Sequence, residues 1–308
     1  MYKFNKILVG LDHSETDVDL IKGASYMCEL AGSSTVYFVN IIREVNIPDK
    51  LLKEFPNLLT QAVEDRKKDL NKLVDKHFNN KEVKVVVNVI VDQGQVTKAL
   101  LKHTSDEKID LLVLGRKNEK KGGGVLVNRL ARRVSCSLLI IPKGKKLSVD
   151  KILIPTDFSE YSKHALEKAA SLLRKSKSEG ELLIQNVYQV PVGYHYTGKS
   201  FKEFSEIMKD HAKKDFKIYS KSIDLSDLKV EQIYSLDKDE DITSDIHRVG
   251  KKEHVKLIVI GAKGRTATTA LFIGSKAEKL IQVNADIPLL VIRPKGKNAG
   301  IIDYLKEL

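Results

Sequence analysis

The sequence is short of cysteine, and this scarcity argues against a fold stapled by disulfides. Only Cys28 and Cys136 occur in 308 residues, each in an apolar stretch typical of a helix or of the start of a strand. Small secreted domains that depend on disulfides carry a much denser set of cysteines. We therefore expect two inert core thiols and a reducing, cytoplasmic environment.

Long apolar runs are also missing. None approaches the roughly 20 residues that a helix needs to span a bilayer. The first apolar run, Ile7–Leu11, is interrupted by Asp12, so we do not interpret it as a signal peptide. It is typical of a buried strand, and we expect no contact with a membrane.

The motifs of several enzyme classes are absent. No Gly-x-Gly-x-x-Gly follows the first strand, no Walker A sequence occurs, and no Gly-x-Ser-x-Gly elbow is present. The histidines are scattered without metal-ligand spacing, and no pair of carboxylates stands out as an acid–base couple. We therefore assign no catalytic residue and no metal ligand among the protein side chains, and we expect no efficient enzyme.

Acidic residues are nearly lacking in one stretch, residues 116–146, which contains ten basic residues and a single acidic one, Glu119. The whole chain carries a net charge of +12. Such a stretch attracts phosphates or nucleic acid, but no aromatic residues interleave the charges as a base-stacking surface would require. A solvated helix face and loop is the favoured interpretation, and nucleic-acid binding is the weaker alternative.

The chain contains one pattern twice, which is the signature of tandem homologous domains. Three blocks recur in the same order, the first two at spacings of 145 and 146 residues. The matched blocks are Lys6–Glu15 with Lys151–Glu160, Asp110–Gly115 with Lys256–Gly261, and Leu138–Lys145 with Leu289–Lys297, the last with one inserted residue. We predict a first domain over residues 1–146, a second over 150–296 and a C-terminal tail over 297–308.

Within each copy, apolar strand-like runs alternate with amphipathic stretches at helical spacing, which predicts an α/β fold. The expected strands are 5–11, 35–42, 83–91, 110–115 and 138–142 in the first copy, and 151–156, 181–188, 229–235, 256–261 and 288–292 in the second. The fourth strand of each is almost continuously apolar, as in a parallel sheet covered by helices. Each copy is therefore expected to be a doubly wound five-stranded parallel sheet of order 3-2-1-4-5. Residues 191–198 are loop-like, and a helix with a Phe and Met stripe follows.

Open doubly wound sheets bind ligands at the carboxyl ends of their strands, where the strand order reverses. In the second copy the first strand ends in Pro155, Thr156 and Asp157, and the fourth is followed by Gly-x2-Gly-x9-Gly-Ser over Gly261–Ser275. Glycine lets the backbone approach a phosphate, and the start of a helix attracts an anion. Lys263 and Arg265 are candidates for added positive charge.

These residues also have purely structural interpretations. Ser275 with Glu278 forms a potential capping box, the glycines suit an ordinary strand-to-helix turn, and Asp157 suits a cap for the helix that begins near Ser159. Because all three features fall on one expected crevice, we favour phosphate binding there.

The block Ile152–Glu160, together with the Gly-x2-Gly-x9-Gly-Ser pattern, resembles the universal stress protein family, and the resemblance covers both copies. In ATP-binding members that glycine pattern cradles the triphosphate, while an Asp after the first strand and the backbone at the end of the second hold the adenosine. The resemblance thus implies ATP as the ligand, with Mg or Mn as a companion metal. It implies binding roles for Asp157, Val187, Gly261, Gly264, Gly274 and Ser275.

The first copy departs from this pattern. Asp12 and Gly115 are retained, but Asn118 stands at the second glycine and Asn128-Arg129 at the Gly-Ser pair. The glycines at 122–124 leave anion binding open, and a degenerate, structural first copy is the preferred interpretation.

The leading hypothesis is a stress-response regulatory protein that binds ATP in its second domain and acts on a protein partner that the sequence does not identify. Slow ATP hydrolysis at that site stays open. The alternative is a ligand-free scaffold that acts through protein contacts. Because family members pair through the fifth strand, the resemblance implies pairing of the two copies within the chain, and further homo-oligomers stay open. A nucleotide-dependent transferase is a third hypothesis.

Overall fold

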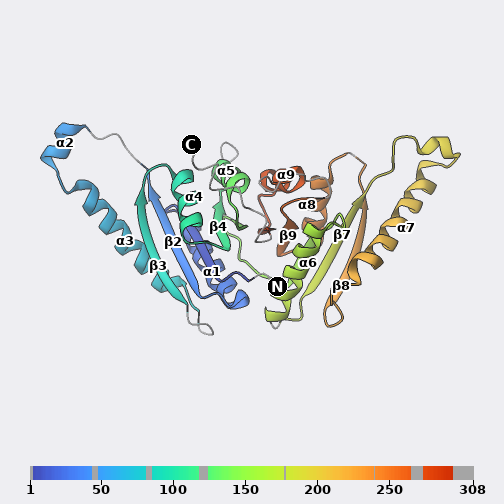
Figure 1. Cartoon of the computed structure of the whole chain (residues 1–308), viewed down its shortest axis with the longest axis horizontal. Helices are drawn as coiled ribbons and strands as arrows, with labels where there is room; N and C mark the ends of the chain where they lie inside the picture. The colour runs from blue at the N-terminus through green and yellow to red at the C-terminus, as the bar shows by residue number, and fades with distance from the viewer. Residues whose placement is uncertain are drawn as a thin grey trace. The chain divides into compact units, whose positions relative to one another are not determined.

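The structure is a computed structural model that describes residues 3–43, 48–80, 85–117, 124–176, 178–238, 240–264 and 273–293. The chain divides into two compact units, residues 1–146 and 147–308, and each is described by itself. Figure 1 shows the helices and strands of both.

The first unit is a parallel five-stranded sheet of order β3-β2-β1-β4-β5, so the predicted order 3-2-1-4-5 is confirmed. Its strands are β1 (Lys6–Leu11), β2 (Thr35–Ile42), β3 (Val86–Gln93), β4 (Leu111–Arg116) and β5 (Ser137–Pro142). Its helices are α1 (Thr16–Ala31), α2 (Asp49–Glu54), α3 (Leu58–His77), α4 (Val96–Asp106) and α5 (Val125–Arg133).

The second unit repeats this arrangement, with the order β8-β7-β6-β9-β10. Its strands are β6 (Lys151–Pro155), β7 (Glu181–Tyr188), β8 (Lys229–Leu236), β9 (Leu257–Gly261) and β10 (Leu289–Ile292). Its helices are α6 (Glu160–Ser176), the short 3₁₀ helix η1 (Tyr194–Thr197), α7 (Phe201–Ser220), α8 (Ile242–Lys252) and α9 (Ser275–Val283).

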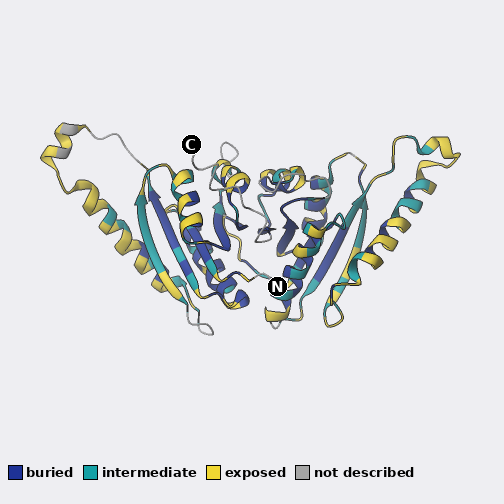
Figure 2. Cartoon of the chain, in the orientation of Figure 1, coloured by how far each residue is buried: buried dark blue, intermediate teal, exposed yellow. Residues whose placement is uncertain are grey.

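The central strands form the core of each unit, as the dark blue ribbons of Figure 2 show. All five residues of β9 are buried, and so is most of β4, which confirms the prediction from their continuous apolar runs. Helices pack closely on these strands. A Cβ added at Gly261 would lie 2.6 Å from the Tyr161 carbonyl oxygen, so α6 approaches β9 within the space that only glycine leaves.

The outer helix α7 begins at a capping box, in which Ser200 and Glu203 bond to each other's backbone N–H. The expected helix is present, but Phe201 is 43% exposed, so the stripe of large side chains at its start is not all core. The residues of α7 that are buried are Ser205, Ala212 and Phe216.

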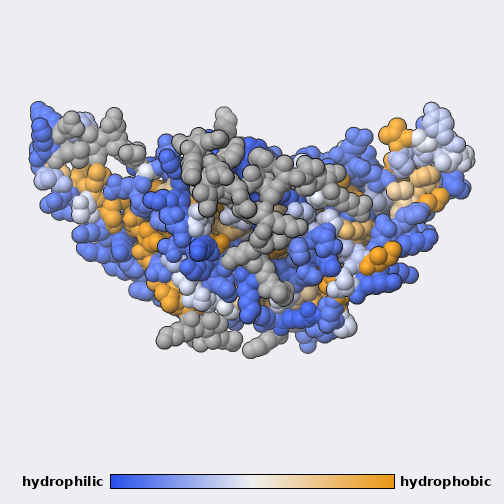
Figure 3. Space-filling view, in the orientation of Figure 1, coloured by the Kyte–Doolittle hydropathy of each residue, from blue (hydrophilic) through white to orange (hydrophobic). Residues whose placement is uncertain are grey.

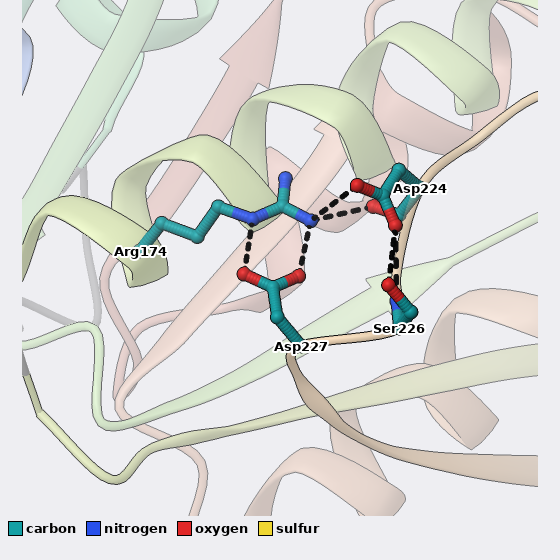
Figure 4. Close-up of polar contacts among 4 residues, drawn as sticks. All are labelled: Arg174, Asp224, Ser226 and Asp227. Carbon is teal, nitrogen blue, oxygen red and sulfur yellow. Dashed lines mark hydrogen bonds and ion pairs between the residues drawn. The ribbon is translucent and has the colours of Figure 1, made fainter.

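The loop from α7 to β8 is fastened to α6 by Arg174 (Figure 4). The guanidinium donates from Nε and Nη2 to the two carboxylate oxygens of Asp227, at 2.8 and 2.6 Å, and from Nη2 to the Asp224 carbonyl at 2.7 Å. Ser226 in turn bonds to the Asp224 carboxylate. This planar, two-point contact fixes the entry into β8.

Cys28 and Cys136 are buried free thiols, and burial raises the pKa of Cys28 to about 12, so this thiol stays protonated. Among the helices in the described part of the chain, none has the length and apolar character needed to cross a membrane.

Candidate functional site

The turn between β6 and α6 carries Thr156 and Asp157, and Thr156 is already engaged by the protein. Its N–H donates to the Gln185 carbonyl at 2.8 Å, and its carbonyl accepts from Asn186 at 2.9 Å. Its hydroxyl donates to Ser162 and accepts from the Phe158 N–H, both at 3.0 Å. Thr156 therefore shapes the turn from a buried position.

Phe158 adopts a left-handed backbone conformation, with φ of 63°. Few residues of this bulk do so, because the side chain then crowds the following carbonyl. The ring is held against α7, with its centroid 5.4 Å from that of Tyr219 and 6.5 Å from that of Phe216. This packing turns the chain so that Asp157 and Phe158 face different neighbours.

Asp157 lies against the backbone of Gly264. One carboxylate oxygen, Oδ1, accepts from the Ser159 N–H at 3.1 Å and from the Ser159 hydroxyl at 2.6 Å. The other, Oδ2, lies 2.7 Å from the position that a Cβ on Gly264 would take. The structure thus brings together the two segments that follow β6 and β9. The direct cap of α6 is Ser159, whose hydroxyl accepts from the Ser162 N–H at 3.3 Å, so Asp157 supports the cap without being it.

Gly264 and Gly274 lie side by side. The Gly274 N–H donates to the Ala262 carbonyl at 2.7 Å, and a Cβ on Gly274 would lie 3.3 Å from that oxygen and 3.7 Å from the Gly264 nitrogen. The φ of Gly274 is −70°, which any residue adopts. Glycine therefore serves here for space and not for an unusual backbone angle.

Helix α9 begins immediately after Gly274, with no side chain capping its start. Gly274 is the N-cap and Ser275 the first helical residue, so the capping box expected from Ser275 and Glu278 is wrong. Ser275 is exposed, and its hydroxyl has no hydrogen-bond partner among the described residues. The N–H groups of the first turn are thus left without a side-chain acceptor, which is the condition for binding an anion.

Of the two basic residues proposed for this segment, Lys263 lies within the described residues and Arg265 does not. Lys263 is buried, and its Nζ lies 5.8 Å from the centroid of the Tyr161 ring. Burial, and then the charge of Arg293, lower its pKa. Arg265 lies outside the described residues, as does the rest of residues 265–272, so its role stays a prediction.

The remaining predicted site residues lie near the same edge of the sheet. Pro155 is the buried last residue of β6. Val187 lies half-buried near the end of β7, opposite Ser235 of β8. Gly261 has a packing role against Tyr161, as described above. Ligand binding by these residues stays a prediction.

The first unit has an internal ion pair at the equivalent place. The Lys117 ammonium lies 2.8 Å from the Asp12 carboxylate, after β4 and β1 respectively. Burial alone would raise the pKa of Asp12, but the contacts with Lys117 and Ser14 outweigh it and lower that pKa. The sequence showed Lys117 only as part of the basic stretch, and nothing in it indicated that this lysine reaches Asp12.

The loop around Asp12 depends on a buried carboxylate. Asp17 accepts the N–H of Asp12 at 3.1 Å and that of His13 at 2.8 Å, and His13 has the same left-handed conformation as Phe158, with φ of 60°. Burial raises the pKa of Asp17 to about 6. In the second unit the corresponding residue is the uncharged Ser162.

Other basic residues of the 116–146 stretch are also engaged within the first unit. Lys143 pairs with Glu15 at 2.7 Å, and the guanidinium of buried Arg116 packs near Gly124. Asn118 and the glycines at 122 and 123 lie outside the described residues, so anion binding by that loop stays a prediction. Across the described ranges, no group of three or more His, Cys, Asp or Glu side chains is arranged to hold a metal ion.

Comparison with known proteins gives a consistent result. The model of the family described as "Universal stress protein family" matches residues 3–142 and 148–293. Universal stress protein MJ0577 of Methanocaldococcus jannaschii is 27% identical over 159 residues, which cover 47% of this chain and 96% of that protein. Universal stress protein MJ0531 of the same organism is 29% identical over 164 residues, 51% of this chain and 89% of that protein.

Among solved structures, a universal stress protein from Archaeoglobus fulgidus superposes with a TM-score of 0.65 at 16% identity, covering 95% of this chain and 99% of that one. The protein PA1789 from Pseudomonas aeruginosa superposes with the same TM-score at 15% identity, covering 99% and 96%. At these identities the likeness establishes the fold alone.

Proposed function

The chain belongs to the universal stress protein family, whose model matches it in two segments, and from this premise we propose that its second unit binds ATP at the carboxyl ends of β6 and β9. The observation that carries the proposal is the meeting of three elements: the Asp157 carboxylate, the backbone at Gly264, and the uncapped start of α9 after Gly274. Each of these elements would bind a different part of the nucleotide.

The phosphates belong at the start of α9. Its first-turn N–H groups have no side-chain acceptor, and the helix dipole adds partial positive charge there. The absent side chains of Gly264 and Gly274 let the segments after β6 and β9 and before α9 approach one another, because a Cβ at either position would meet neighbouring atoms within 3.3 Å. The exposed Ser275 hydroxyl is placed to donate to a phosphate oxygen.

The adenosine belongs nearer β6 and β7. The Oδ2 of Asp157 lies beside Gly264, where it would accept from a ribose hydroxyl, and the backbone near Val187 would face the base. Thr156 holds the turn and contributes through Asp157. A divalent metal, Mg or Mn, would be held by the phosphates and water, because the described residues supply no carboxylate cluster for it.

The first unit is proposed as a structural partner that binds no nucleotide. Lys117 supplies a cation to Asp12 from within the chain, so a ligand there would have to displace an ion pair. Nucleotide occupancy of the second unit would then be the signal that a protein partner reads. Stress response, a cytoplasmic location and pairing of the two copies remain part of this proposal.

The test is calorimetric titration of the full chain with ATP and Mg, comparing the wild type with Gly274→Asp. Aspartate is a favoured N-cap residue, so its carboxylate should take the amides meant for the phosphates. Because its Cβ would lie 3.3 Å from the Ala262 carbonyl oxygen and from the Lys263 Cα, a thermal unfolding scan checks that the variant remains folded. We expect the affinity to fall by about tenfold or more. Gln61→Asp, at an exposed position of α3 in the first unit, adds negative charge outside the second unit and should leave the affinity unchanged.

Two results would count against the proposal. Equal ATP affinity in the wild type and Gly274→Asp would show that the start of α9 does not bind the phosphates. Absence of any binding heat with the wild type, together with no nucleotide in the purified protein by mass spectrometry, would favour the ligand-free scaffold.

A further inference from the structure

Strand β3 is the outer strand of the first unit's sheet, and none of its eight residues is buried. Val86 is 59% exposed and Val87 is 40% exposed. Figure 3 shows hydrophobic side chains in a stripe beside α3 and β3. Exposed apolar edges are sites where another strand adds, because their backbone groups remain unpaired.

The outer strand of the second unit carries charges within its length, whereas the charge of β3 is confined to Asp92 near its end, which lies 3.0 Å from His103 of α4. Strand β8 is equally unburied, but it carries the charged residues Lys229 and Glu231 and the polar Gln232 along its length. Residues 85–91 of the first unit read Val-Val-Val-Asn-Val-Ile-Val, with no charge at all. This contrast between two copies of one fold points to a function for the uncharged stretch of β3.

The hydrogen bonds to β2 determine which residues of β3 face outward. The Val86 N–H donates to Ser34 and the Gly94 N–H donates to Ile42, each at 3.0 Å. Because the backbone direction alternates along a strand, the even-numbered residues between them also bond toward β2. The odd-numbered residues, among them Val87 and Val89, therefore present their N–H and C=O groups to the open edge.

The sequence of this edge is close to its own mirror image about Asn88. In an antiparallel pair with a second copy, centred on Asn88, Val87 stands opposite the partner's Val89 and Val86 opposite the partner's Ile90. Val87 and Val89 both face outward, so each such pair exchanges two hydrogen bonds. Asn88 stands opposite the partner's Asn88 at a non-hydrogen-bonded position, where side chains approach most closely. This symmetry favours a second copy of the chain over an unrelated peptide as the partner.

We propose that β3 is an interaction surface for a second copy of this chain, which pairs with it antiparallel about a two-fold axis at Asn88. A two-fold contact uses the same patch on both copies and closes as a dimer. The proposal is independent of nucleotide binding, since β3 lies in the first unit and the proposed ATP site in the second.

The test is a charge exchange at the two-fold axis, followed by sedimentation velocity of the full chain over a range of concentrations. Asn88→Lys places two lysines opposite each other, and Asn88→Asp places two carboxylates, so each variant alone should dimerise roughly tenfold or more weakly than the wild type. An equimolar mixture of the two variants should recover dimers, because opposite charges then meet. Gln232→Lys on β8 is the matched control and should dimerise like the wild type.

Amide hydrogen exchange of the wild type provides a readout that needs no variant. The N–H groups of Val87 and Val89 should become protected as the protein concentration rises, while those of β8 stay unchanged. A wild type that remains monomeric at every concentration overturns the proposal. So does a dimer that Asn88→Lys leaves intact, and so does equal weakening by Asn88→Lys and Gln232→Lys.

Discussion

Lys117 stands 2.8 Å from Asp12 in the first unit, at the place where the second unit has Asp157 beside the bare backbone of Gly264. The carboxylate after the first strand thus has different neighbours in the two units. In the first unit the carboxylate has a cation from its own sequence. In the second, the lysine at the matching position, Lys263, lies buried near the ring of Tyr161.

The proposed ATP site in the second unit predicts different ATP affinities for two matched substitutions. Asp157→Ala should weaken ATP binding by about tenfold, because a ribose hydroxyl would lose a charged acceptor. Asp12→Ala should leave the ATP affinity unchanged. Calorimetry on the two variants checks the assignment, and an equal loss in both would mean that the first unit also contributes to binding.

The ion pair itself predicts a shift in acidity. In the wild type the pKa of Asp12 is lowered, since the contacts with Lys117 and Ser14 together outweigh burial. Lys117→Ala removes the ammonium and leaves burial opposed by Ser14 alone, so the Asp12 pKa should rise above that of the wild type. A carboxyl-detected NMR titration of both proteins measures it. Lys143→Ala, which removes the partner of Glu15, should leave Asp12 unaffected, and a lower Asp12 pKa in Lys117→Ala would contradict the prediction.

Much of the fold could be predicted because the central strands are continuous apolar runs, such as Leu257–Ile260, that fit only a sheet covered on both faces. The expected start of β3 was less accurate, at 83 instead of Val86. As an edge strand that is buried on neither face, it lacks the sharp change in pattern that marks the ends of a buried strand.

For the candidate site, the sequence predicted which segments of the backbone meet, but not their local conformation. Topology and glycine spacing indicated that Asp157 and Gly264 would meet. The capping box at Ser275 was wrong, because a serine and a glutamate three residues apart do not by themselves determine where a helix begins. The left-handed Phe158 was not foreseen, since its backbone is held by rings of α7 that are distant in sequence.

The buried carboxyl of Asp17 predicts a dependence of stability on pH. Its folded pKa of about 6 lies above the unfolded value of about 3.9. Between these values the folded state keeps a proton that the unfolded state has released, so this group's contribution to stability falls as the pH rises.

Asp17→Asn removes that titration, although it also replaces one acceptor of the backbone N–H groups of Asp12 and His13. We therefore expect the melting temperature of the wild type, minus that of Asp17→Asn, to decrease steadily from pH 4 to pH 6.5 and then level off. Scanning calorimetry measures the difference. A difference that stays constant or grows over this range would show that Asp17 does not hold its proton in the folded state.

Gly261 and Gly115 occupy the same position in the two copies, and their surroundings predict unequal costs for adding a methyl group. At Gly261 the new Cβ would meet the backbone carbonyl of Tyr161 at 2.6 Å, and a buried backbone has no alternative rotamer. At Gly115 it would meet the Thr16 side chain at 2.8 Å, which has some freedom to adjust. We expect Gly261→Ala to lower the free energy of unfolding by about 2–3 kcal/mol and Gly115→Ala by about 1 kcal/mol. Urea unfolding followed by circular dichroism measures both, and a Gly115→Ala variant that is the less stable of the two would mean that α6 yields more readily than the Thr16 side chain.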